Sequence, residues 1–290
     1  MITTDTFIEI GSQHKVCEDY IIAKDNYIIL ADGCSRSENS DMGARILCYM
    51  AQQFMNYHSM KPYVPGFHDQ LGLWIIHNAE VTARHLGLKS TSLDATLLIA
   101  YQLEDHIHIH MFGDGCILLQ LNTMEIFSMY EIYSIDFDKN MPFYLRYLID
   151  EDGKANYHKQ KISQYLKCKS VFRKDDNEVT DRGVLDETAY DNPTHFQYPI
   201  SNFKSISICS DGIASFLDPD ASPNSNKLIE IPSFIHEILG FKVTTGEFLK
   251  RRMNKYSKQL KKAGVEHYDD LSIGTFLIEE SFDGEDNWID

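Results

Sequence analysis

Four short acidic motifs in this sequence contain the residue types that bind hard metal ions. They are Glu18-Asp19, Asp32-Gly33, Asp211-Gly212 and Asp269-Asp270, and three of the four stand at the ends of apolar runs. Oxygen-only ligands suit Mg²⁺ or Mn²⁺, which are held octahedrally with several waters. Two such ions bridged by a carboxylate and a water would supply a nucleophile near neutral pH and would clamp a phosphoryl group. The residues therefore indicate metal-assisted chemistry that needs no protein nucleophile.

Their placement separates candidate ligands from ordinary turns. The sequence has five Asp-Gly pairs: Asp32-Gly33, Asp114-Gly115, Asp152-Gly153, Asp211-Gly212 and Asp283-Gly284. Taken alone, each pair is typical of a tight turn. The pairs at 32, 114 and 211 directly follow strand-like runs, whereas those at 152 and 283 lie in polar surroundings. A carboxylate at a buried strand end is held rigidly, and the following glycine lets the backbone approach what the carboxylate binds.

Periodicity predicts the elements that position these residues. Strands are expected at 5–10, 20–31, 96–100, 106–112, 116–121, 205–209 and 271–278. Helices are expected from Ser40 to about residue 58, from 69 to 86, and from a capping box of Thr244 and Glu247 to about Ala263. Residues 122–204 are the least regular third. Strands come in adjacent groups with helices between the groups, which favours a layered, antiparallel-rich α+β fold.

Composition narrows the class of protein. The chain has 290 residues, with 43 acidic and 27 basic side chains and a formal charge of −16, so nucleic acid and anionic membrane surfaces are excluded as expected partners. Its six cysteines show no C-x-x-C or zinc-type spacing and are interpreted as free thiols. We identify no signal peptide and no apolar run of transmembrane length, and we expect a cytoplasmic protein.

The order of the motifs resembles a known family. Glu18-Asp19, Ala31-Asp32-Gly33, Phe112-Gly113-Asp114-Gly115, Ser210-Asp211-Gly212 and Asp269-Asp270-Leu271-Ser272 are similar to the motif series of the metal-dependent (PPM, or 2C-type) Ser/Thr protein phosphatases. The opening over residues 11–19 is closer to the bacterial branch. The resemblance covers about residues 5–280. It implies one domain over 1–290 with a four-layer α-β-β-α sandwich of two antiparallel sheets, a substrate-selecting flap within 122–204 and an acidic tail at 279–290.

The resemblance also implies roles for individual residues. Asp32 would bridge two Mg²⁺ or Mn²⁺ ions, and the Gly33 carbonyl would bind one of them. Asp211 and Asp269 would ligate one ion, while Glu18 and Asp19 would act directly or through water.

Asp114 matches a residue that, with the aspartate of Ser210-Asp211-Gly212, holds a weaker third ion in some members. Asp32, Asp211 and His14 would be the catalytic residues of a cytoplasmic signalling hydrolase. Its partner would be a protein phosphorylated on serine or threonine.

Two departures from the family pattern bear on the site. The family often has an arginine that grips phosphate four residues before the Glu of Glu-Asp, and here that position is His14; Lys15 or Arg36 could substitute. The usual Asp-Asn of the last motif is Asp269-Asp270, so which carboxylate ligates is open, although position favours Asp269.

Two other functions are compatible with the same fold. One is a catalytically silent pseudophosphatase or regulatory binding module, and the other is a phosphatase acting on a small phosphate ester or a partner-switching regulator. The enzyme is favoured over the silent module because every ligand carboxylate is retained. The sequence leaves the oligomeric state open.

Two features outside the motifs were weighed against plainer interpretations. His106, His108 and His110 alternate with apolar residues, which places them on one face of a strand. A zinc or nickel site is one interpretation, and a solvated strand face is favoured over it. The basic face of the 244–263 helix could dock an acidic partner, but an ordinary exposed helix face is favoured there.

Overall fold

The computed structural model describes residues 1–57, 66–123, 128–173, 177–189, 194–219 and 227–279. Its strands are β1 (Ile2–Glu9), β2 (Asp19–Lys24), β3 (Tyr27–Gly33), β4 (Ala95–Leu103), β5 (His106–Phe112), β6 (Gly115–Leu121), β7 (Ser128–Phe137), β8 (Ser163–Arg173), β9 (Asn177–Ala189), β10 (Thr194–Pro199), β11 (Phe203–Cys209) and β12 (Leu271–Ile278). Its α-helices are α1 (Ser40–Tyr57), α2 (Phe67–His85), α3 (Glu151–Lys159), α4 (Ile235–Leu239) and α5 (Phe248–Lys262). Short 3₁₀ helices are η1 (Ser90–Leu93), η2 (Asp138–Asn140), η3 (Leu145–Leu148), η4 (Ile200–Asn202), η5 (Asp211–Ala214) and η6 (Ile231–Ser233).

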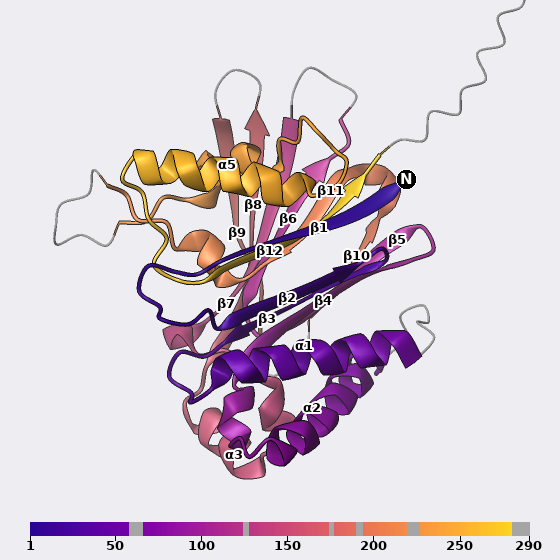
Figure 1. The fold of residues 1–290 in the computed structure, drawn as a ribbon, viewed down its shortest axis with the longest axis vertical. Helices are drawn as coiled ribbons and strands as arrows, with labels where there is room; N and C mark the ends of the chain where they lie inside the picture. Colours follow the sequence, from indigo (N-terminus) through magenta and orange to yellow (C-terminus); the bar gives the residue numbers. More distant parts are fainter. Residues whose placement is uncertain (58–65, 124–127, 174–176, 190–193, 220–226, 280–290) are drawn as a thin grey trace, which may run out of the picture.

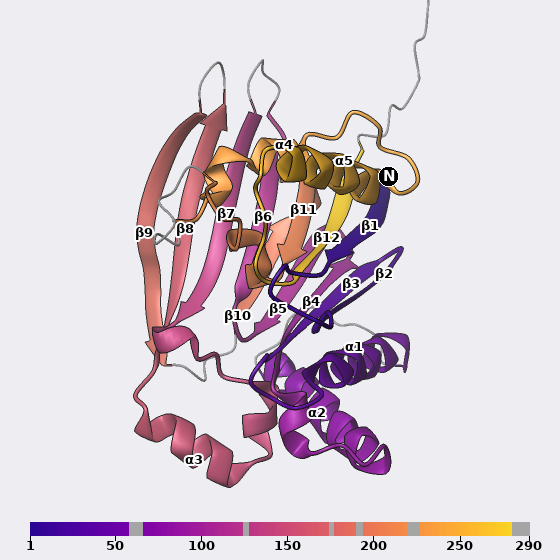
Figure 2. The same cartoon turned by 60° about the vertical axis from the view of Figure 1, so that its left-hand side comes forward.

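Two antiparallel sheets lie face to face between two layers of helices (Figure 1). One sheet has seven strands in the order β1-β12-β11-β6-β7-β8-β9, and the other has five in the order β10-β5-β4-β3-β2. Helices α1 and α2 cover the five-stranded sheet, and α4 and α5 cover the seven-stranded sheet (Figures 1 and 2). The predicted four-layer α-β-β-α sandwich is therefore confirmed.

Three apolar cores hold the layers together, one at each boundary between them. The continuous apolar run of β3 is explained by burial on both of its faces. Ile29 and Ala31 pack toward α1 and α2, while Ile28 and Leu30 face the other sheet. The remaining core lies between the seven-stranded sheet and α4–α5 and includes Leu249 of α5.

Most predicted elements are confirmed, and several boundaries differ. Residues 20–31 form two strands rather than one, because the chain turns at Asp25 and Asn26 between β2 and β3. The predicted capping box is wrong: α5 begins at Phe248, and the residue before it, Glu247, makes no side-chain cap.

The prediction that 122–204 is irregular is also wrong for the described residues. Strands β7, β8 and β9 extend the seven-stranded sheet, and β10 joins the edge of the other sheet. The only described α-helix in this region is α3. The predicted acidic tail lies outside the described residues from position 280 onward. No described helix combines the length and the apolar character needed to cross a bilayer.

Candidate metal centre

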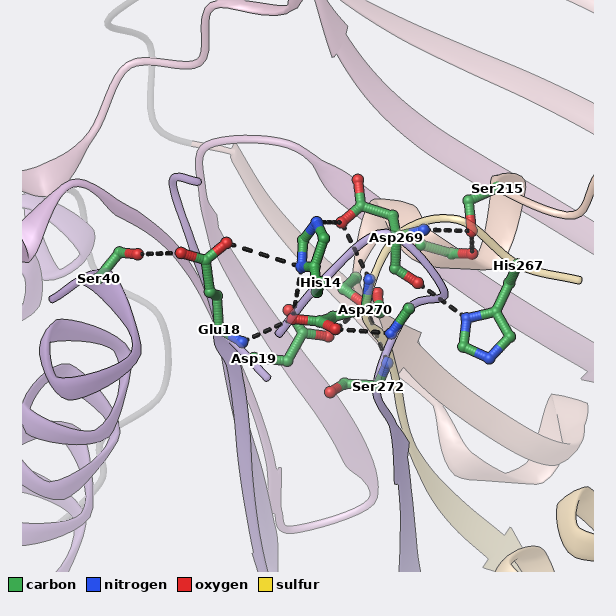
Figure 3. A network of polar contacts seen from close by, with 12 residues as sticks. His14, Glu18, Asp19, Ser40, Ser215, His267, Asp269, Asp270 and Ser272 are labelled. Atoms are coloured by element: carbon green, nitrogen blue, oxygen red, sulfur yellow. Dashed lines mark hydrogen bonds and ion pairs between the residues drawn. The ribbon is translucent and has the colours of Figure 1, made fainter. Parts of the chain in front are cut away.

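Strand pairing brings the two ends of the chain to one edge of the sandwich. Strand β1 pairs with β12, so the loop after Glu9 lies beside the loop before Leu271. The amides of Ser12 and Gln13 donate to the carbonyls of His267 and Tyr268, at 2.9 and 3.2 Å. The predicted residues Glu18 and Asp269 therefore lie on either side of His14, although they are far apart in sequence (Figure 3).

Register places carboxylates from both sheets at the same edge. Within the five-stranded sheet, Asp19 at the start of β2 lies opposite Asp32 near the end of β3. In the other sheet, Cys209 of β11 lies opposite Cys116 of β6. Asp211 lies two residues after Cys209, and Asp114 lies two residues before Cys116. The antiparallel pairing therefore brings both aspartates to the same end of these strands.

Gly33 follows Asp32 at a position where backbone segments crowd. A Cβ atom added to Gly33 would lie 2.8 Å from the Ser40 carbonyl oxygen and 2.9 Å from that of Glu18. The Gly33 amide donates to the same Glu18 carbonyl at 3.2 Å. The glycine is therefore needed to pack the end of β3 against the Ser40 and Glu18 backbone.

The carboxylates raise one another's pKa values. Burial and then the charges of Asp19, Asp211 and Asp114 hold the pKa of Asp32 well above its ordinary value. Burial and the charge of Asp269 raise the pKa of Asp211 to about 6, although a hydrogen bond with Asp32 opposes the shift. For Asp19 and Asp114 too, burial is the largest cause of a raised pKa.

These carboxylates have the chemistry of a hard-cation site. Among the described residues, Asp19 Oδ1 is buried without a hydrogen-bond partner, while Asp19 Oδ2 accepts from Ser210 Oγ at 2.8 Å. Clustered, desolvated negative charge is costly unless a cation neutralises it. The donors are all oxygens, which suits Mg²⁺ or Mn²⁺. The residues present therefore fit the divalent ions that the motif resemblance implies.

Asp269 and Asp270 differ in exposure and in their hydrogen bonds. The Asp270 side chain is 1% exposed, and its two oxygens accept from the Gly11 and Glu18 amides at 2.7 and 2.5 Å. The Asp269 side chain is 31% exposed, and its Oδ1 accepts from the Asp270 amide at 2.9 Å. Asp270 thus clamps the loop before β2, and Asp269 is the carboxylate left to face the centre.

His14 lies among the carboxylates rather than apart from them (Figure 3). Its Nδ1 is 3.0 Å from Asp270 Oδ2 and 3.6 Å from Glu18 Oε2, and its Nε2 is 3.4 Å from Asp269 Oδ1. Burial opposes protonation, but the Asp270 side chain and the charges of Asp269 and Glu18 together raise the pKa of His14 above its usual value. His14, Glu18 and Asp270 each place a ligand atom within 4.8 Å of the others. The two alternatives, Lys15 and Arg36, are exposed.

Several supporting residues were not predicted. Ser40 at the start of α1 donates to Glu18 Oε1 at 2.7 Å, and Ser210 donates to Asp19. Each serine sits beside a motif, but its sequence position alone does not show which carboxylate it reaches. Tyr144 was also missed: burial raises the pKa of its hydroxyl, and so do Cys34, Asp114 and Asp32 close to it.

A cavity of about 440 Å³ opens beside the centre. Asp114, Asp211 and Tyr268 line it on one side, and Lys167 and Lys169 of β8 line it on another. Its walls therefore include the strands that extend the seven-stranded sheet, in the region predicted to contain the substrate-selecting flap.

Comparison with known proteins agrees with this geometry. Residues 11–139 match the family model described as protein phosphatase 2C. No curated protein sequence matches the chain significantly. The serine/threonine phosphatase Stp1 from Staphylococcus aureus is 14% identical, with a TM-score of 0.53, over 97% of this chain and 96% of its own.

Two further solved structures give the same result. The catalytic domain of the serine/threonine phosphatase PstP, solved with two manganese ions, is 12% identical with a TM-score of 0.51, over 96% of this chain and 99% of its own. A mutated bacterial serine phosphatase is 13% identical with a TM-score of 0.56, over 96% of this chain and 98% of its own. At these identities the similarity shows the fold.

The family-model match covers residues 11–139, and the chain as a whole shares the fold of PPM-type phosphatases. The resemblance inferred from the motifs is thereby confirmed, and the prediction of a phosphatase-type enzyme is in keeping with the family match.

Proposed function

We propose that this protein hydrolyses phosphoserine and phosphothreonine on proteins, with two Mg²⁺ or Mn²⁺ ions held by its carboxylate centre. One observation carries the proposal. Carboxylates from both sheets, among them the half-buried Asp32 and Asp114, raise one another's pKa values, and the largest contributions come from burial and from neighbouring acids. Divalent cations would offset the repulsion between these carboxylates and would therefore stabilise the folded protein.

The ligand set follows from how each carboxylate is engaged. Asp32 would bridge the ions because it interacts with acids from both sheets. Asp211 and Asp269 would each ligate one ion, as would the Gly33 carbonyl. Glu18 and Asp19 already accept hydrogen bonds from Ser40 and Ser210, so they would contribute their remaining oxygens or act through water. Asp114, whose pKa the Asp211 charge raises, would contribute to a weaker third site.

The bound ions would neutralise phosphoryl charge and activate a water molecule for in-line attack. The chain's own residues orient the groups around them. Ser40 and Ser210 hold Glu18 and Asp19, and the Asp270 clamp fixes the loop that carries His14. A protonated His14 would donate from Nε2, the nitrogen nearest Asp269, to the departing alkoxide.

The surroundings support a protein substrate in a reducing compartment. The cavity beside Asp114 and Asp211 would receive residues that flank the phosphorylated side chain, so the 122–204 region would set selectivity. All six cysteines are free thiols, in keeping with the cytoplasm. We expect residues 1–290 to act as one domain.

Phosphate release from a phosphothreonine peptide tests the proposal. It is measured with Mn²⁺, with Mg²⁺ and with EDTA, beside Mn²⁺ calorimetry on the same samples. We expect metal-dependent turnover in the wild type and its loss, together with weakened Mn²⁺ binding, in Asp32→Asn. Asp152→Asn is the matched control, since it changes another Asp-Gly aspartate in the first turn of α3 and should leave both readouts unchanged.

Each outcome has a distinct meaning. The protein could bind Mn²⁺ and hydrolyse a small phosphate ester but not phosphopeptides. That result would make small phosphate esters, rather than phosphoproteins, the substrate class. A folded protein that neither binds Mn²⁺ nor releases phosphate would refute the enzyme and favour a regulatory binding module.

A further inference from the structure

A second group of metal-ligating side chains lies away from the carboxylate centre, on the outer face of the five-stranded sheet. It comprises His68 in the first turn of α2, His108 and His110 of β5, and His195 of β10; these four are called the histidine cluster below. The predicted solvated strand face is wrong for two of the histidines, since His108 is 3% exposed and His110 is fully buried. His68 of α2 lies against His110, and His195 of β10 lies against His108, which is why the strand's alternation did not expose these two histidines.

The four rings form one connected arrangement. His110 Nδ1 lies 2.9 Å from His68 Nδ1, and His108 Nδ1 lies 3.2 Å from His195 Nε2. The two pairs adjoin, because the ring centroids of His110 and His195 are 4.6 Å apart. Tyr101 of β4 stacks on His108 and His110, and its hydroxyl is 3.3 Å from His110 Nε2.

This hydrogen bonding leaves one buried nitrogen unsatisfied in either tautomer. If His110 donates from Nδ1 to His68, then His68 carries its own proton on Nε2. If His68 donates instead, its Nε2 is a bare acceptor. In both cases His68 Nε2 is buried without a partner among the described residues, and His68 is only 4% exposed. An unsatisfied buried polar atom of this kind costs about 1–3 kcal/mol.

The rings are held in the form that binds metals. Burial, followed by the charge of a neighbouring histidine, lowers the pKa of His68 to about 3 and that of His195 to about 4. Burial likewise lowers the pKa values of His108 and His110. Neutral imidazole is the ligand for borderline transition metals such as Zn²⁺, whereas Mg²⁺ and Mn²⁺ prefer oxygens.

The spacing within each pair is close to that of two ligands on one ion, although slightly shorter. Zinc–nitrogen bonds of about 2.0–2.1 Å at tetrahedral angles place two ligand nitrogens roughly 3.3–3.4 Å apart. The observed pairs are at 2.9 and 3.2 Å. No three of these ring nitrogens on described residues yet lie within 4.8 Å of one another, so a ring must turn for an ion to bind. His195 is suited to that movement because it is only half-buried and lies on the edge strand β10.

We propose that the histidine cluster binds one Zn²⁺-like divalent transition-metal ion, separately from the carboxylate centre. The ion would replace the hydrogen bonds within the two pairs and would join α2, β5 and β10. The proposal does not depend on the phosphatase activity.

Zinc calorimetry on the full chain, with Mg²⁺ in excess to occupy oxygen sites, tests the proposal. Cobalt absorption spectra of the same samples show whether the ion is four-coordinate, and X-ray absorption at the zinc edge shows whether its ligands are imidazoles. We expect one ion per chain in the wild type. We expect a loss of affinity of at least about 100-fold in His195→Gln, because even groups that only support a ligand are worth 10–100-fold.

Controls separate this site from folding effects and from the carboxylates. His106→Gln is the matched control, because His106 lies on the same strand but contacts the exposed Asp105. It should bind zinc like the wild type. His108→Gln is the second cluster variant if His195→Gln does not fold, as judged by circular dichroism. Zinc binding should also survive in Asp32→Asn.

Three results would overturn the proposal. The first is that the folded wild type takes up no zinc. The second is that folded His195→Gln and His108→Gln still take up zinc. The third is that Asp32→Asn loses zinc uptake while the cluster variants retain it.

Discussion

The two adjacent aspartates before β12 should respond in opposite ways to substitution. Asp270→Ala removes the acceptor for the Gly11 and Glu18 amides, whose bonds to the carboxylate are 2.7 and 2.5 Å long. Hydrogen bonds to a charged acceptor contribute about 1.5–3 kcal/mol each, and removing the acceptor leaves both donors without it. Asp269→Ala removes a partly exposed carboxylate from a group of like charges.

The expected magnitudes follow from these contacts. Two lost bonds amount to about 3–6 kcal/mol, and relief of repulsion with neighbouring acids returns about 1–2 kcal/mol. The free energy of unfolding should therefore fall by about 1–5 kcal/mol in Asp270→Ala. For a chain of this size that corresponds to a melting temperature lower by about 2–10 °C. In the metal-free protein, Asp269→Ala should melt at or slightly above the wild-type temperature.

Three assays check these expectations. Calorimetric melting in EDTA measures stability, hydrogen exchange over residues 10–19 measures opening of the loop, and Mn²⁺ titration measures metal binding. Asp270→Ala should accelerate exchange at Gly11 and Glu18, whereas Asp269→Ala should weaken Mn²⁺ binding without changing exchange. The assignment of clamp and ligand would be refuted if Asp270→Ala melted like the wild type while Asp269→Ala lost stability.

Three further substitutions probe the supports of the site. The contact with His267, whose Nε2 lies 3.7 Å from Glu9 Oε2, and the hydrogen bonds from Lys261 and Ser257 together outweigh burial and lower the pKa of Glu9 to about 2. The stabilisation is therefore complete above pH 4.5 and is lost as the pH falls toward 2. Glu9→Gln should therefore cost about 1–2 kcal/mol at pH 7, allowing for solvent screening, and almost nothing at pH 2, as measured by urea unfolding. Arg146→Met leaves the buried Asp94 without its ion-pair partner at 2.6 Å and should cost about 3–5 kcal/mol in the same assay; an unchanged midpoint would contradict this. Gly212→Ala places a Cβ 1.8 Å from the Asp270 carbonyl oxygen, so we expect Mn²⁺ affinity to fall at least about tenfold as the backbone moves, and unchanged calorimetry would show that the packing is looser.

Much of the carboxylate centre could be predicted because its candidate ligands stand where apolar runs end. A short apolar strand identifies both a buried element and the edge at which it stops, so Asp32 and Asp211 were found without knowledge of the topology. The hairpin between β2 and β3 was missed, because its turn at Asp25 and Asn26 lies inside a run that otherwise reads as one strand.

What could not be predicted depends on contacts between distant segments. Asp269 and Asp270 are chemically identical, and only the approach of the loop 10–18 makes one of them a clamp. The histidines of β5 have the spacing of a solvated face, but His68 of α2 packs against His110, and His195 of β10 packs against His108. The 122–204 region reads as irregular because its strands alternate partly exposed residues with few continuous apolar runs.

Asp270 and Asp32 are in opposite electrostatic environments. Asp270 is buried, but backbone amides satisfy both of its oxygens, so the fold itself stabilises its charge. Asp32 is half-buried beside other acids that raise its pKa, so its charge opposes the fold until a cation is present. A ligand that binds only the folded state stabilises it in proportion to its affinity, and divalent ions should therefore stabilise this protein through Asp32 and its neighbours rather than through Asp270. The bonds to Asp270 hold the loop beside the centre in place, whereas the negative charges of the candidate ligands are not offset by other residues. A site that depends on a metal ion requires this condition.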